Sequence, residues 1–281
     1  PIHLLKYHIK ASPVRTVLLF AARSFLKLLQ SLFCHRFLPQ PVTNAPIALV
    51  FSHHHSSNTI SLYSDFYYGS LSQSLTSSGV SSVVALHNHS SLPLPESAFH
   101  YSDLSQVRIH IPSILPLLQE LRILYWQICS FLRSSFSRLD THCPHLLALN
   151  SECLSSSTAA NLRFYIYASN LIKHYRPIAV IVTFEGHPWE RLAFLAARTQ
   201  DPSTRCIAYH HTLASPYQHG VLRSLGPLYD PDSILFAGQY SLNCFSSNSN
   251  YFPRLDLVGT PRHDHVRTDI SEKILAAQAT P

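Results

Sequence analysis

The sequence predicts an α/β fold: a Rossmann-like, doubly wound parallel sheet with extra long helices and an N-terminal helix. Short strands rich in apolar and β-branched residues alternate with helical patterns, most clearly after residue 177. Near-continuous apolar strands of this kind are typical of a parallel sheet that is covered on both faces. Hydrophobic residues make up 46% of the 281 positions and charged residues 13%, so the chain can bury a substantial core.

The first element is a basic, apolar stretch that we predict as a helix over residues 14–38. Five polar or charged residues interrupt it, so it is not a membrane-spanning helix. These are Arg15, Arg23, Lys27, Gln30 and Arg36. Two interpretations stay open: an amphipathic helix in peripheral contact with a membrane surface, or a helix packed on protein. Pro39 and Pro41 indicate a linker, so residues 1–41 are expected to precede a domain of residues 42–265.

Strands and helices then follow one another at short intervals. Gly79 ends the first helix of the domain, and Pro177 ends its third, because proline cannot continue a helix. The expected strands are 45–51, 81–87, 107–111, 178–183, 205–209, 233–237 and 254–258. The expected helices are 62–75, 113–138, 156–175, 188–199 and 240–246. Residues 266–281 are expected to be a tail or the start of an interdomain linker.

Composition excludes several classes of protein. The net charge of +6 favours anionic partners, but no dense Lys/Arg stripe interleaved with aromatic residues occurs, so no nucleic-acid partner is expected. Six scattered cysteines without a CxxC pair fit a reduced, cytoplasmic setting, with the inner face of the membrane as an alternative. The sequence contains no Met, so we expect it to be a fragment of a longer protein.

Polar residues gather where the strand at 178–183 ends, and open parallel sheets bind ligands at the carboxyl ends of their strands. Gly186 allows the chain to turn, and the N-terminus of the following helix favours an anion. Glu185 is expected to act as a general base or to grip sugar hydroxyls, and capping of the following helix is the alternative. His187 is expected to contact substrate.

The helix that follows contains three further notable residues. Trp189 belongs to an apolar stripe at helical spacing and is better explained as a core anchor than as a ligand platform. Glu190 and Arg191 are sequence neighbours and do not face each other, so a salt bridge elsewhere is expected for each.

The next strand ends in His210 and His211. Neighbouring strand residues point to opposite faces of the sheet. One of the two is therefore expected to reach the ligand-binding crevice at the carboxyl ends of the strands. A neutral imidazole there can take a proton from an acceptor hydroxyl, and both stay catalytic candidates beside a structural role. The expected substrate contacts in the loop above are Tyr217, Gln218 and His219.

Two later strands, 233–237 and 254–258, are each followed by a glycine at the carboxyl edge of the predicted sheet. Gly238 and Gly259 stand where backbone must approach a neighbour or ligand closely. Arg262 is expected to pair with a phosphate, and an ion pair with Asp264 is the alternative.

Histidine clusters at 53–55, 87–89 and 263–265 raise the question of a metal. Zinc sites do use histidine, but no HExxH motif is present and adjacent histidines rarely ligate one ion together. We therefore expect no metal, and we expect His53 and His54 to contact substrate.

Four segments, taken in order, resemble a known family. They are FEGHPWERLAFLAAR (184–198), IAYHHTLASPYQHG (207–220), PDSILFAGQYS (231–241) and LVGTPRHD (257–264). Together they resemble the N-terminal, acceptor-side domain of GT-B glycosyltransferases from capsule and other bacterial surface-carbohydrate synthesis. The resemblance covers residues 175–264 well and the first hundred residues in outline. It rests on spacing and context, and no single motif is diagnostic.

The resemblance implies an enzyme whose first domain holds a carbohydrate or lipid-linked acceptor and whose second holds a nucleotide sugar. It implies a reaction without metal or cofactor, in which a base of the first domain deprotonates the acceptor. Glu185 and His211 are the favoured bases, followed by His210 and His219. The donor-binding domain is expected to be missing from this sequence.

Other enzyme classes lack their signatures in this sequence. There is no GxSxG elbow, no GxGxxG after the first strand and no P-loop or kinase motif. Glycosyl transfer from a nucleotide sugar is therefore the predicted function. The alternative is a non-catalytic sugar- or nucleotide-binding module that docks on a membrane assembly.

Overall fold

The computed structural model describes residues 13–34, 45–54, 65–88, 101–103, 106–136, 151–214, 219–247 and 254–260. The chain divides into two compact units, which we call the helical unit (Pro1–Leu38 and Pro112–Tyr167) and the sheet unit (Pro39–Ile111 and Ala168–Pro281). This division differs from the single domain predicted over 42–265, because residues 112–167 group with the N-terminal helix. The predicted tail at 266–281 lies outside the described residues.

The sheet unit has the α/β, Rossmann-like, doubly wound architecture that the sequence predicts. Its strands are β1 (Ile47–His54), β2 (Ser81–Asn88), β3 (Tyr101–Asp103), β4 (Gln106–His110), β5 (Ala179–Thr183), β6 (Arg205–His210), β7 (Ser233–Phe236) and β8 (Leu255–Leu257). Within the described residues they lie in the order β3-β4-β2-β1-β5-β6-β7-β8. All neighbours are parallel except β3 and β4, and the antiparallel strand β3 was not predicted.

The strand order reverses between β1 and β5. β2 and β4 continue from one side of β1, and β6, β7 and β8 continue from the far side of β5. Such a reversal is the topological switch point of a doubly wound sheet, and the loops after the two strands part there to leave a crevice. The carboxyl ends of β1 and β5 are therefore the place to look for a site.

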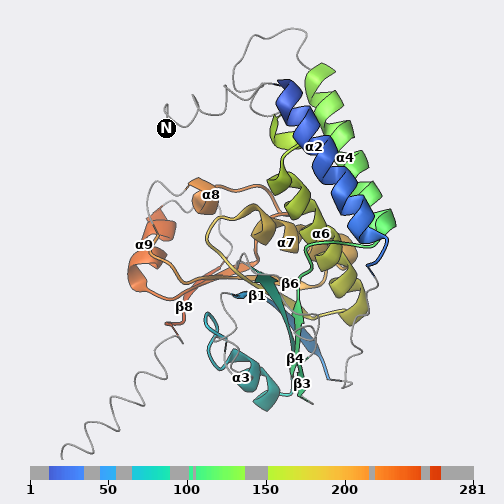
Figure 1. The fold of residues 1–281 in the computed structure, drawn as a ribbon. Coiled ribbons are helices and arrows are strands. Elements are labelled where there is room, and N and C mark those ends of the chain that lie inside the picture. The colour runs from blue at the N-terminus through green and yellow to red at the C-terminus, as the bar shows by residue number, and fades with distance from the viewer. Residues whose placement is uncertain are drawn as a thin grey trace, which may run out of the picture. The chain divides into compact units, whose positions relative to one another are not determined.

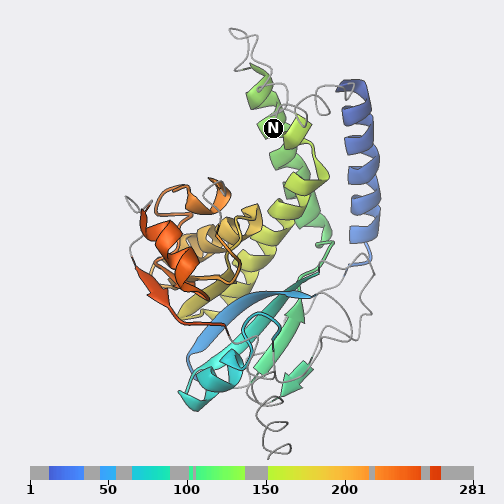
Figure 2. The ribbon, with the colours of Figure 1, turned by 90° about the vertical axis from the view of Figure 1, so that its left-hand side faces the viewer.

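Helices cover both faces of this sheet (Figures 1 and 2). They are α3 (Leu71–Ser77), α7 (Pro188–Gln200), α8 (His219–Leu222), α9 (Gln239–Ser247) and the end of α6 (Ser156–Tyr175). α3 lies on one side of the sheet and α7 on the other (Figure 1). α8 was not predicted from the sequence.

Strand alternation explains how each face packs. Val50, Ile181 and Tyr209 form one cluster with Tyr67 and Tyr68, which lie just before α3. The next residues along each strand point the other way. On that opposite face, Phe184, just after β5, packs on Phe194 of α7, and Phe236 of β7 packs on Phe245 of α9. Both faces of the sheet are thus buried, as its near-continuous apolar strands predict.

α3 starts later than predicted. Residues 65–70 form a turn in which the Asp65 carboxylate accepts hydrogen bonds from the N–H groups of Tyr67 and Tyr68, at 2.8 and 3.1 Å. Gly79 follows the helix with φ +77°, so glycine ends it as predicted. The predicted start at residue 62 lies outside the described residues.

The helical unit contains α2 (Pro13–Ser31), α4 (Leu117–Phe136) and the first part of α6. α2 and α4 lie side by side (Figures 1 and 2). The buried carboxylate of Glu120 accepts two hydrogen bonds of 2.7 Å from the guanidinium of Arg163 on α6 and one of 2.9 Å from the N–H of Leu115. A buried charge with this many partners can stabilise the unit, whereas an unpaired one would not.

No helix in the described part of the chain is long and apolar enough to cross a membrane.

We expect Phe51→Ala to lower the free energy of unfolding by about 3–5 kcal/mol, because it leaves a cavity in a fully buried position of the central strand β1. Leu257→Ala on β8, where the side chain is half exposed, should change it by less than about 0.5 kcal/mol. Urea unfolding followed by circular dichroism measures both. Equal losses for the two variants would contradict the assignment of β1 to the core.

Candidate functional site

The candidate site lies at the switch point, where the chain leaves β5. Gly186 takes φ +96°, a left-handed conformation that favours glycine, and this turns the chain from β5 into α7. His187 precedes the helix in an extended conformation, and Pro188 is its first residue. The short turn therefore holds Glu185 and His187 beside the end of β6, where His211 follows.

Glu185 and His211 form the shortest polar contact of the site. The Oε1 atom of Glu185 lies 2.6 Å from Nε2 of His211, and its Oε2 atom lies 3.3 Å from Nε2 of His187. The His211 side chain is 2% exposed and that of Glu185 24%. Hydrogen bonds from His187 and His211 hold the pKa of Glu185 well below its usual range, and Glu185 raises the pKa of His187. The structure thus brings together three residues that the sequence selected.

Aromatic rings join His53 to the same group. Nε2 of His53 lies 3.0 Å from Oγ1 of Thr183, and the His53 ring lies 5.1 Å from Tyr67 and 5.2 Å from Trp189 between centroids. Tyr67 also packs edge-on against His211 at 4.6 Å. His53 is therefore near the Glu185–His211 pair, as expected for a substrate contact, and Tyr67 connects the two.

Trp189 is buried and stacks on His87, with centroids 5.5 Å apart and planes at 19°. This burial supports its role as a core anchor. Sequence reasoning considered His87 only as part of a metal cluster and did not select Tyr67. The position of His87 at a strand end was a usable signal, but nothing local marked Tyr67, which the sequence analysis had assigned to a helix.

His210 lies on the opposite face from His211. It is fully buried, its Nδ1 lies 2.5 Å from the carbonyl of Phe184, and its ring packs on Phe236 and Phe245. Burial lowers its pKa. Of the two histidines, one reaches the site, as strand alternation predicts. The buried position of His210 on the opposite face gives no support to a catalytic role for it.

His54 also points away from the site. Its ring lies 5.0 Å from that of His110 on β4, on the face opposite to His53. Burial, together with His54, lowers the pKa of His110 to about 4. Because adjacent strand residues alternate between faces, the expectation that His54 contacts substrate has no support from this position.

The two glycines have backbone roles in the structure. The carbonyl of Gly259 accepts a hydrogen bond of 3.2 Å from the hydroxyl of Tyr209, and its φ of +82° favours glycine. The carbonyl of Gly238 accepts the N–H of Leu242 at the start of α9. Tyr217, Gln218 and Arg262 lie outside the described residues. His219 begins α8, and its side chain is likewise outside what is described.

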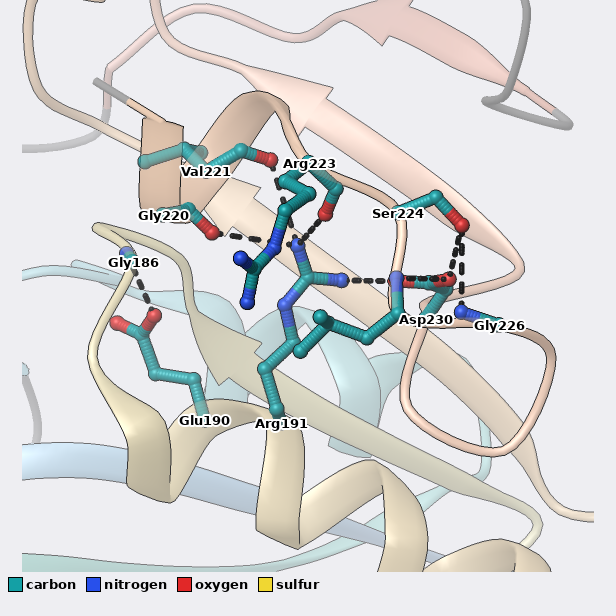
Figure 3. Close-up of polar contacts among 10 residues, drawn as sticks. Gly186, Glu190, Arg191, Gly220, Val221, Arg223, Ser224, Gly226 and Asp230 are labelled. Carbon is teal, nitrogen blue, oxygen red and sulfur yellow. Dashed lines mark hydrogen bonds and ion pairs between the residues drawn. The ribbon is translucent and has the colours of Figure 1, made fainter. Parts of the chain in front are cut away.

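Glu190 does not form the salt bridge that was expected for it. Its carboxylate is fully buried and accepts three backbone hydrogen bonds, from Glu185 at 2.8 Å, Gly186 at 2.8 Å and His187 at 2.9 Å (Figure 3 shows the second). Burial raises its pKa to about 7, while the three donors favour the ionised form. The three N–H groups therefore donate to Glu190 and not to a bound anion, which the sequence analysis expected at this helix N-terminus. Capping of the helix, the alternative role for Glu185, is likewise performed by Glu190.

Arg191 forms a buried ion pair with Asp230, so the salt bridge expected for it is confirmed (Figure 3). Its Nη2 also donates to the carbonyls of Gly220, Val221 and Arg223, at 3.4, 3.3 and 3.0 Å. Arg191 thereby fixes the segment that contains α8 next to α7.

Close backbone contact holds the same segment against the turn after β5. A Cβ atom on Gly220 would lie 3.1 Å from the carbonyl oxygen of Gly186, closer than nearly all real Cβ contacts. A Cβ atom on Gly186 would lie 3.0 Å from a methyl group of Val221. A side chain at 220 would require the neighbouring backbone to shift by a few tenths of an ångström, and at 186 the positive φ favours glycine as well.

Within the described residues, no group of three or more His, Cys, Asp or Glu side chains is arranged to hold a metal ion. His55, His89, His263 and His265 lie outside the described residues. The absence of a metal stays a prediction.

Comparison with known proteins adds little to this geometry. No known protein family matches the sequence, and neither does any curated protein. Among solved structures, the UDP-GlcNAc 2-epimerase from Methanocaldococcus jannaschii is similar with a TM-score of 0.42 and 10% identity, over 76% of this chain and 45% of that one. The UDP-GlcNAc 2-epimerase from Neisseria meningitidis, bound to UDP-GlcNAc, is similar with a TM-score of 0.44 and 12% identity. The likeness covers 83% of this chain and 51% of that one.

The chain spans about half the length of both structures. Likenesses this weak carry no argument about activity, and neither protein is a capsule glycosyltransferase. The fold class stated above rests on the order and direction of the strands in this protein.

Glu190 should make stability depend on pH. A raised pKa means that the folded protein holds the carboxyl proton more tightly than the unfolded chain, whose ordinary value is 4.5, so stability falls as pH rises from about 4.5 to about 7. We expect the unfolding free energy of the wild type relative to Glu190→Gln to fall by about 3 kcal/mol over that interval. Urea unfolding at several pH values measures it.

Glu152→Gln, which changes an exposed carboxylate, is the control for the loss of a carboxylate as such. A flat or rising difference for Glu190→Gln would mean that its three N–H donors outweigh burial and keep the carboxylate ionised throughout.

Arg191→Met should lower the free energy of unfolding by about 3–5 kcal/mol, because it leaves the buried carboxylate of Asp230 without its cation. Arg198→Met removes the same kind of ion pair from the same helix, but its partner Asp232 is 44% exposed. We expect a loss of about 1 kcal/mol or less there. Thermal and urea unfolding compare the two, and equal losses would refute the assigned role of burial.

Proposed function

We propose that the sheet unit is the acceptor-side domain of a glycosyltransferase of the GT-B type that uses a nucleotide sugar. The observation that carries the proposal is the 2.6 Å contact between Glu185 and His211 at the switch point of the sheet. A carboxylate that orients an imidazole is the arrangement that general-base catalysis on a hydroxyl requires.

Glu185 itself is a poor base, because its lowered pKa keeps it ionised and leaves it little affinity for a proton at neutral pH. The same property suits it to a positioning role. Its carboxylate accepts Nε2–H of His211, which fixes the ring and stabilises the imidazolium that forms when the other nitrogen takes a proton. His187 contacts the second carboxylate oxygen and helps to hold it in place.

His211 is the proposed base. Its Nδ1 atom is buried and has no hydrogen-bond partner among the described residues. In the proposed step, the acceptor oxygen bonds to the anomeric carbon of the sugar while the bond from that carbon to the nucleoside diphosphate breaks. The proton of the acceptor hydroxyl moves to Nδ1. Because the ring is 2% exposed, the acceptor reaches it only after neighbouring side chains move, and Tyr67 is packed against it.

The proposed acceptor is a carbohydrate or a lipid-linked sugar, and His53 and His187 are its proposed contacts. His53 is held by Thr183 and by the rings of Tyr67 and Trp189, so its position is fixed before substrate binds. The donor sugar would be bound by a second domain, as in the family that the sequence resembles.

His211→Gln should lower kcat by at least about a hundredfold and change the KM for the nucleotide sugar little, because it removes the base and no donor contact. Glu185→Gln should lower kcat in the same way. His174→Gln on α6 is the matched control, since the His174 ring packs on Tyr175 of the same helix. The assay screens nucleotide sugars and acceptors with the full reading frame, and mass spectrometry detects the nucleoside diphosphate and the product.

Equal kcat values for wild type and His211→Gln would overturn the proposal. Binding of a sugar acceptor with no turnover of any nucleotide sugar would also overturn it, in favour of a non-catalytic binding module.

A further inference from the structure

α2 packs along one side in the helical unit. Ser31 is buried and donates a hydrogen bond of 2.7 Å to the carbonyl of Leu28. Arg23 and Lys27 reach backbone carbonyls of the same unit, those of Leu154 at 3.2 Å and Ser113 at 3.5 Å. The packed side of α2 is therefore partly polar.

The opposite side of α2 exposes large apolar residues. Phe25 is 65% exposed and Phe33, just after the helix, 84%. The other exposed members are Val17, Leu18, Leu19, Leu26, Leu29 and Leu32. Leu18, Phe25, Leu29 and Leu32 recur at spacings that place them on one helical face. This face is a continuous apolar stripe along the length of the helix.

α4 carries a second stripe of the same kind. Leu118 is 80% exposed and Phe136 72%. Leu121, Tyr125, Ile128 and Leu132 lie between them, at steps of three and four residues, and all are exposed. Two neighbouring helices thus each present an apolar face to solvent, which a monomeric soluble protein rarely does.

The charged residues beside these stripes have a single sign. Arg15, Arg23, Arg122 and Arg133 are exposed. α2 contains no Asp or Glu, and the carboxylate of Glu120 on α4 is buried against Arg163. In the sequence, the first acidic residue is Asp65. The described surface of these two helices is therefore apolar and cationic.

We propose that the helical unit docks on an anionic lipid surface through the exposed faces of α2 and α4. Apolar side chains would enter the boundary between headgroups and acyl chains, and the arginines would pair with lipid phosphates. Self-association through the same faces would bring arginines near arginines, and the described residues of α2 and α4 offer no exposed carboxylate to pair with them, which opposes binding. The proposal does not depend on the function assigned to the sheet unit.

Co-sedimentation with phosphatidylcholine vesicles, with and without about 30% phosphatidylglycerol, tests the proposal. The wild type should bind the anionic vesicles, and added salt should weaken binding. Phe25→Glu/Leu29→Glu should bind them at least about tenfold more weakly, since it places charge in the apolar boundary. Both positions are exposed, so folding should be unaffected, as circular dichroism would verify.

Leu228→Glu, which changes an exposed leucine of the sheet unit, should bind as the wild type does. Arg122→Glu/Arg133→Glu tests the charge independently and should weaken binding to anionic vesicles only. Equal binding by wild type and Phe25→Glu/Leu29→Glu would overturn the proposal. Absence of vesicle binding, with a dimer that this variant converts to a monomer in light scattering, would replace it with self-association.

Failure of this experiment leaves the glycosyltransferase proposal standing, since His211 and Glu185 lie outside the helical unit. The reverse holds as well, because His211→Gln should bind vesicles as the wild type does.

Discussion

Parallel pairing of β1 with β5 is the constraint on which the candidate site depends. Val50 faces Ile181 and Phe51 faces Val182 across this pair, and the four side chains are buried. Because the remaining strands extend outward from the two, the loops that leave β1 and β5 diverge at their carboxyl ends. A different pairing would separate His53 from Thr183, and the cluster around them would not form.

Helix α7 stabilises the site through two adjacent residues that point in different directions. Glu190 satisfies three N–H groups of the turn between β5 and the helix. Arg191 satisfies carbonyls of the α8 segment while it neutralises Asp230. Each is a buried charge, which is tolerated only when it is paired or fully hydrogen-bonded. Together they hold the turn after β5 and the α8 segment, which contact each other at Gly186 and Gly220.

The two units use apolar residues differently. The sheet unit buries the apolar residues of its strands on both faces of the sheet. The helical unit exposes apolar residues on α2 and α4, while Ser31 of α2 is buried and Lys27 reaches the carbonyl of Ser113. The free-energy cost of exposing these apolar faces implies a partner for that surface.

The sequence by itself determined the alternation of strands and helices and, with it, the parallel sheet and the placement of Glu185 and His211 at strand ends. It also determined that only one of His210 and His211 reaches the site, because side-chain direction along a strand alternates. Only the tertiary structure decided that Tyr67 packs on His211 and that Asp230 partners Arg191. These residues are far apart in the chain, and local patterns do not specify which distant segments meet.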